Sequence, residues 1–133
     1  MRAESILYAL LGASPGLAAL VGTRIYLDTR PEEDALPAVV YELIHEKQDD
    51  ARIGEPETVT ARLQVNCLAA MAEDAVAVRE AVRLACHNRS GTIAGYTVIA
   101  CLEESAGPDS YDHLVNIYAK PMDFILHYLR ETS

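Results

Sequence analysis

Histidines and acidic residues are the side chains in this sequence that could do acid–base or metal chemistry. The four histidines show no HxH or HExxH spacing and are spread along the chain as His45, His87, His113 and His127. Asp109, Asp112 and His113 share one loop, and oxygen-rich clusters of this kind can hold a divalent cation. A carboxylate run beside a Gly-Pro turn is usually only solvated, so we expect no metal.

The remaining polar residues do not form a recognisable catalytic set. Glu103 and Glu104 are adjacent on a predicted strand, so their side chains point to opposite faces and cannot work as a paired acid and base. The sequence has no glycine-rich phosphate loop, nucleophile elbow or GxGxxG motif, and no serine has a base and an orienting acid nearby. Catalytic triads can be formed by residues that are distant in the sequence, so the absence of these motifs makes catalysis less expected but does not exclude it. We expect no enzyme activity and no cofactor.

The three cysteines are Cys67, Cys86 and Cys101. Their number is odd, no two form a CxxC pair, and each lies within an apolar pattern. These features predict buried free thiols and not disulfides or zinc ligands.

Length and composition indicate one globular domain over residues 1–133, with 50% hydrophobic and 23% charged residues. There are 20 acidic and 11 basic side chains, and the net charge of −9 opposes non-specific attraction to nucleic acid phosphates. The apolar stretch near the N-terminus is short and interrupted by Glu4 and Ser5, so we expect neither a signal peptide nor a membrane span, and we place the chain in a cytoplasm.

The most informative segment runs from residue 58 to 70, where apolar and polar residues alternate as in a half-buried strand. One face is predicted to be dry and carries Val59, Ala61, Leu63, Val65 and Cys67. The other face carries Thr58, Thr60, Arg62, Gln64 and Asn66. Because that second face is polar and mostly uncharged, it could meet water or another protein surface.

Other patterns predict the elements around this strand. Apolar spacing favours a helix over 4–11, and Ser14-Pro15 begins a second short helix that Gly22 ends. A longer helix is predicted over 72–87, with a stripe of Ala75, Val78, Val82, Ala85 and Cys86. Further strands are predicted at 24–27, 37–46 and 96–104 and from 115 onwards, with polar loops at 28–35, 47–57 and 106–112. Pro121 predicts a bend or bulge in the last strand, favouring an edge position or different pairing on its two sides.

Several of these pieces, in this order, resemble the phage tail completion family, the tail terminators or tail-to-head joining proteins of long-tailed phages. The pieces are LAALVGTRIY at 17–26, ALPAVVYELI at 35–44, TARLQVNCLAA at 60–70, EDAVAVREAVRLAC at 73–86 and YAKPMDFILHY at 118–128. They cover most of the chain, and none is a catalytic signature. Lys120 and Pro121 stand where relatives often continue a plain apolar alternation.

The resemblance implies an α+β fold, with a mainly antiparallel four- to five-stranded sheet and two main helices packed on one face. It also implies a structural protein that forms a ring, usually of six copies, at the head-proximal end of the tail tube. Such a ring ends tube growth and joins tail to head. The implied partners are further copies of the chain, the major tail tube protein and a head-completion or neck protein, with no membrane. DNA would pass through without specific binding, and the protein would lie in the virion tail after assembly in the host cytoplasm.

Two surfaces are candidates for subunit or tube contacts. One is the predicted hairpin tip, with Asp49, Asp50, Arg52, Glu55 and Glu57. The other is the polar strand face with Arg62, Gln64 and Asn66, where Arg62→Glu or Gln64→Glu is expected to weaken assembly more than stability. The alternatives are another neck component, such as a head-completion connector, and a small α+β ligand-binding domain or enzyme with a pocket around Tyr111, Asp112 and His113.

Overall fold

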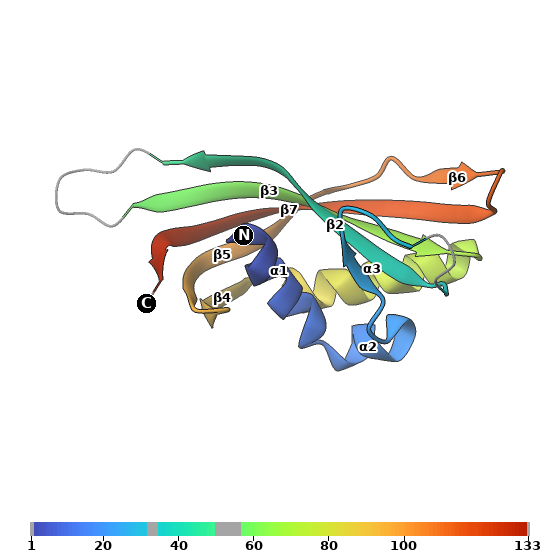
Figure 1. The fold of residues 1–133 in the computed structure, drawn as a ribbon, viewed down its shortest axis with the longest axis horizontal. Coiled ribbons are helices and arrows are strands. Elements are labelled where there is room, and N and C mark those ends of the chain that lie inside the picture. The colour runs from blue at the N-terminus through green and yellow to red at the C-terminus, as the bar shows by residue number, and fades with distance from the viewer. Residues whose placement is uncertain (1, 32–34, 50–56, 133) are drawn as a thin grey trace.

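The computed structural model describes residues 2–31, 35–49 and 57–132, and its shape is set by long, twisted strands with helices beneath them (Figure 1). The helices are α1 (Ala3–Gly12), α2 (Pro15–Val21) and α3 (Ala72–Cys86). The strands are β1 (Ile25–Leu27), β2 (Ala38–Gln48), β3 (Thr58–Ala69), β4 (Arg89–Ile93), β5 (Tyr96–Ala106), β6 (Ser110–Asp112) and β7 (Ile117–Thr132).

The seven described strands form one sheet in the order β1-β2-β3-β7-β5-β4, and β6 pairs with β7 off this path. The β1–β2 pair is parallel and the other pairs are antiparallel. The predicted α+β class is therefore confirmed, and most strand pairs are antiparallel as expected, but the expected number of four to five strands is wrong. The β1–β2 pair makes the sheet mixed, and β4 and β6 make it larger than expected. Both are short and largely exposed, so neither shows the alternation by which a strand is recognised.

The strand β3 lies inside the sheet and has the predicted dry face. Its side chains alternate between buried and half-buried along all 12 residues. On one side it pairs with β2, and on the other it pairs with β7 without a register break from Thr58↔Leu129 to Ala69↔Tyr118. A strand that is hydrogen-bonded on both sides and dry on one face fixes the register of the whole sheet.

All three described helices cover the same face of the sheet (Figure 1). The predicted stripe of α3 is buried, as are Ile6, Leu7 and Leu11 of α1. The short α2 begins as predicted, with Ser14 Oγ accepting a hydrogen bond from the Leu17 backbone N–H at 3.1 Å and Pro15 in the first turn. Its end also follows the prediction, because Gly22 adopts a φ of +61° that favours glycine.

One hydrophobic core joins the helices to the sheet, with Phe124 and Tyr128 of β7 among its largest fully buried side chains. The three cysteines lie in this core as free thiols, as predicted. Burial disfavours the thiolate and raises the pKa of Cys67 and of Cys101 to about 12. Among the described residues, no single helix is long and apolar enough to cross a membrane. The pair α1 and α2 reaches that length and composition only together, across an 84° bend.

Pro121 does not bend β7 away from β3, because their register is continuous through the Asn66↔Pro121 pair. β7 is also not an edge strand. Instead, its partner on the other side changes at this point, from β6 at residues 117–119 to β5 at residues 122–132. The Pro121 carbonyl faces that junction and accepts a hydrogen bond from the Gly107 N–H at 2.9 Å. Proline lacks a backbone N–H, and this gap lies where the partner strand of β7 changes from β6 to β5. Of the alternatives predicted for Pro121, different pairing on its two sides is therefore the one observed.

Candidate assembly interface

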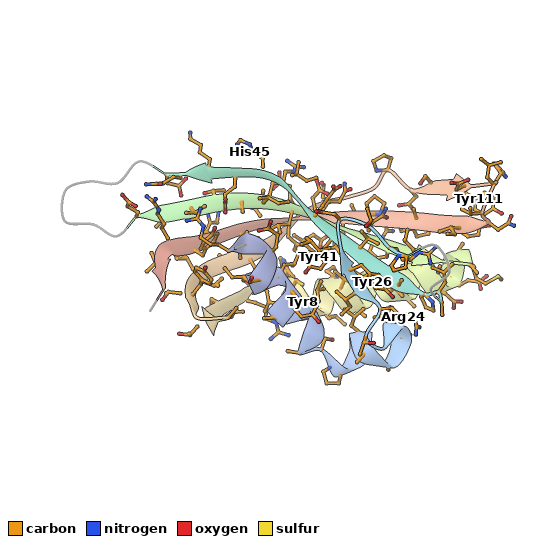
Figure 2. All side chains as sticks on the ribbon, viewed as in Figure 1. Tyr8, Arg24, Tyr26, Tyr41, His45 and Tyr111 are labelled. Carbon is orange, nitrogen blue, oxygen red and sulfur yellow. The ribbon has the colours of Figure 1, made fainter. Side chains whose placement is uncertain are left out.

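The polar side chains of β3 lie on the sheet face opposite the helices, and no described helix covers that face (Figures 1 and 2). The register places His45, Arg62, Ile125 and Leu102 in one row across β2, β3, β7 and β5. Leu102 is exposed there, and Arg62 and Ile125 are half-buried. This uncovered face thus mixes apolar and polar groups, as a protein contact surface commonly does.

A cluster of charged and amide groups occupies the middle of this face. Arg62 donates from Nε at 3.0 Å and from Nη2 at 2.8 Å to Asp123 Oδ2, and Gln64 Nε2 donates to Asp123 Oδ1 at 3.2 Å. The Asp123 side chain is 13% exposed and that of Arg62 is 39% exposed. Two of the predicted contact residues are therefore held in place by a carboxylate of the neighbouring strand, and the surface they present is ordered before any partner arrives.

A second polar cluster closes the base of the β2–β3 hairpin. Thr58 Oγ1 donates to Asp49 Oδ2 at 2.9 Å, and Thr60 Oγ1 lies within 3.1 Å of both Asp49 carboxylate oxygens. Thr60 Oγ1 is also 3.0 Å from His127 Nδ1. Asp49, predicted as a contact residue, thus joins β2 to β3.

Glu57 and Asn66 differ from the other described candidates. Glu57 Oε2 accepts a hydrogen bond from Arg130 Nη1 of β7 at 2.9 Å, and this bond joins the base of the hairpin to β7. Asn66 is half-buried, and its Oδ1 atom is buried without a hydrogen-bond partner among the described residues. A buried acceptor without a partner is costly, so Asn66 has a hydrogen bond to gain from a partner group or water. Asp50, Arg52 and Glu55 lie outside the described residues.

Residues 106–112, predicted as a loop, contain β6, which forms a second hairpin with the start of β7. Its base is held by Asp109, which accepts hydrogen bonds from Arg79 Nη1 of α3 and from Lys120 Nζ, both at 2.8 Å. Lys120 and then Arg79 hold the pKa of the Asp109 carboxyl below its usual range. The only sequence signal was the spacing of Tyr111 and Tyr118, which pair across the hairpin.

Of the three residues named for a possible pocket, Tyr111 and Asp112 lie in β6 and His113 begins the turn that follows it. The Tyr111 ring packs on the His113 ring at 4.7 Å and on the Tyr118 ring at 4.4 Å between centroids. A cavity of about 440 Å³ lies elsewhere, at the junction of α1 and α2 beside the end of α3. Within the described part of the chain, no group of three or more His, Cys, Asp or Glu side chains could hold a metal ion.

The sheet face opposite the described helices and the two hairpins are therefore the main surfaces on which a partner could dock. Comparison with known proteins gives the class of protein. The model of the family described as "Tail completion protein gp17" matches residues 5–114, so the chain belongs to this family. It is therefore a structural protein of phage tails and a virion component.

A solved structure gives the same fold. A chain from the "Virion of native gene transfer agent (GTA) particle" aligns with a TM-score of 0.72 and 21% sequence identity, over 96% of this chain and 94% of that chain. At that identity the likeness shows the fold alone. A search of curated proteins found no match.

Proposed function

We propose that this protein forms a ring of six copies at the head-proximal end of the tail tube, where it ends tube growth and joins the tail to the head. Its partners are further copies of itself, the major tail tube protein and a head-completion or neck protein. Assembly takes place in the host cytoplasm, and the ring then stays in the virion tail. The observation that carries the proposal is the family match over residues 5–114.

The shape of the domain supports a role between two larger bodies. The β3–β7 ladder runs for 12 residue pairs, or about 40 Å at 3.3 Å per residue. The base of the β2–β3 hairpin lies at one end of this ladder, and the β6–β7 hairpin lies at the other (Figure 1). A subunit with different surfaces at its two ends can contact a tube on one side and a neck component on the other.

Charge supports a channel through which DNA passes. Six chains at −9 each give the ring a charge of −54. Acidic side chains facing the channel would repel the phosphate backbone and let DNA pass without adhering.

The proposal is tested by removing the gene from an inducible phage or prophage that carries it. We expect tails of irregular, increased length and heads without tails, because nothing stops tube growth or joins the two parts. Supplying the wild-type chain in trans should restore tail length and joining. Tails of normal length attached to heads in the absence of the protein would overturn the proposal.

A further inference from the structure

The turn of the β6–β7 hairpin presents apolar side chains to solvent. Leu114 is 93% exposed, the largest value among the large exposed apolar residues described, and Val115 is 57% exposed, a value that only Leu114 and Leu84 exceed. Scattered exposed leucines are common on protein surfaces and need no explanation alone. Here, however, two adjacent apolar residues stand at the tip of a projecting hairpin. We call residues 110–117 the finger.

Contacts within the finger hold its apolar tip in place. Tyr111 packs between His113 and Tyr118, and its hydroxyl donates to Asn116 Oδ1 at 2.7 Å. Asp112 Oδ1 accepts a hydrogen bond from the Leu114 N–H at 2.9 Å. A preorganised loop loses little conformational entropy on binding, which is the usual property of a docking element.

The cavity at the junction of α1 and α2, beside the end of α3, is an apolar cleft. Its volume of about 440 Å³ is lined by residues that include Leu10, Ala13, Pro15, Leu84, Ala85 and Arg89. Leu84 is 61% exposed on its rim. Ser14 Oγ caps α2, and the Arg89 guanidinium is held in place by donating to the Ala85 and Leu84 carbonyls at 3.1 and 3.0 Å. Such a cleft suits apolar side chains better than a polar metabolite.

The finger does not reach the cleft of its own chain. Ladder pairing with β7 fixes the finger at one end of the molecule, whereas the α1–α2 junction lies below the middle of the sheet (Figure 1). The occupant must come from another molecule. A second copy of the chain has complementary charges for this contact. The exposed Asp112 carboxylate lies close to Leu114 in the finger, and the exposed Arg89 guanidinium lies at the cleft.

We propose that the finger of one copy inserts Leu114 and Val115 into the α1–α2–α3 cleft of the next copy, with Asp112 facing Arg89. The two patches are different, so the contact is head-to-tail and leaves one unused finger and one unused cleft after each step. Such contacts close into a ring when the rotation between copies allows it. This interface deepens the proposed ring and rests on it.

The test uses two full-length variants, Leu114→Asp, which lacks a working finger, and Leu84→Asp, which lacks a working cleft. Each alone should assemble at least about 30-fold more weakly than wild type by analytical ultracentrifugation, since burying a charge in an apolar pocket removes a central contact. Mixed in equal amounts, they should form dimers of twice 14.5 kDa and no larger species, because one finger and one cleft remain intact. Val76→Asp is the matched control on α3 and should assemble like wild type.

Disulfide cross-linking tests the same contact without the aspartate substitutions, which could prevent folding. The double variant Leu114→Cys/Leu84→Cys should give a ladder of disulfide-linked oligomers on mild oxidation, because the native cysteines are buried. Rings that form equally well with Leu114→Asp, or without the ladder, would overturn this interface and leave the proposed ring intact. A wild-type chain that stays monomeric alone and on purified tail tubes would overturn the ring as well. Cross-linking of Leu114→Cys to the tube protein in place of a second copy would assign the finger to the tube.

Discussion

The Arg62–Asp123–Gln64 cluster should measurably stabilise the fold, although it lies on the uncovered sheet face. Replacing Asp123 by alanine removes three acceptor contacts, two of them from Arg62. Hydrogen bonds to charged groups contribute about 1.5–3 kcal/mol when well shielded, whereas exposed ion pairs contribute about 0.2–1 kcal/mol. Because Asp123 is only 13% exposed, we expect a loss of about 2 kcal/mol, within the range for shielded contacts, and the 39% exposure of Arg62 keeps it in the lower half of that range.

The measurement is chemical and thermal unfolding at a concentration where the chain is monomeric. A loss of that size should lower Tm by roughly 6–10 °C for a domain of this length. A double-mutant cycle with Arg62→Ala should give a coupling energy of about 1 kcal/mol. The control is Glu42→Ala, an exposed carboxylate opposite Gln64 on the same face, which should change stability by less than about 0.5 kcal/mol. A coupling energy near zero would show that the cluster is an ordinary solvated ion pair and would refute this reasoning.

Two further predictions concern the core and the hairpin base. Burial raises the pKa of the Cys67 and Cys101 thiols to about 12, so a thiol reagent at pH 8 should label the native protein very slowly. After unfolding in guanidinium, the same reagent should react with three thiols. Rapid labelling of the native chain would show that the core opens readily. In a second variant, residues 50–56 are deleted and β2 and β3 are joined by a short Gly-Asn turn. Its free energy of unfolding should stay within about 1 kcal/mol of wild type, because Asp49 keeps its hydrogen bonds with Thr58 and Thr60. Tail joining should be lost. Head-joined tails of normal length from that variant would exclude the tip as a contact.

The sequence predicted the parts of the fold that follow strong periodicity. The alternation from Thr58 to Ala69 and the apolar stripe of α3 are both buried as expected, because one wet and one dry face leave a regular signal. β4 and β6 gave no such signal. They are short and largely exposed, so their residues show no apolar alternation, and each is held by pairing with the strand that follows it in the chain.

Contacts between residues distant in the sequence were also not predictable in the candidate interface. Arg62 and Gln64 were recognised as a polar face, but their shared partner Asp123 lies 61 and 59 residues further along the chain. Arg62→Glu was expected to weaken assembly more than stability. Because Arg62 is bonded to Asp123, this substitution should reduce stability together with assembly. Glu42→Lys, at an exposed position on the same face, is the cleaner test of that surface.

The position of the protein in the tail tests the central claim most directly. Wild-type chain carrying a small C-terminal tag, supplied in trans, would be located by gold labelling and electron microscopy of intact particles and of free tails. If the proposed ring exists, label should lie at the head-proximal end only, with about six copies per tail. Label along the tube or at the distal tip, or label that stays on heads separated from their tails, would contradict this proposal.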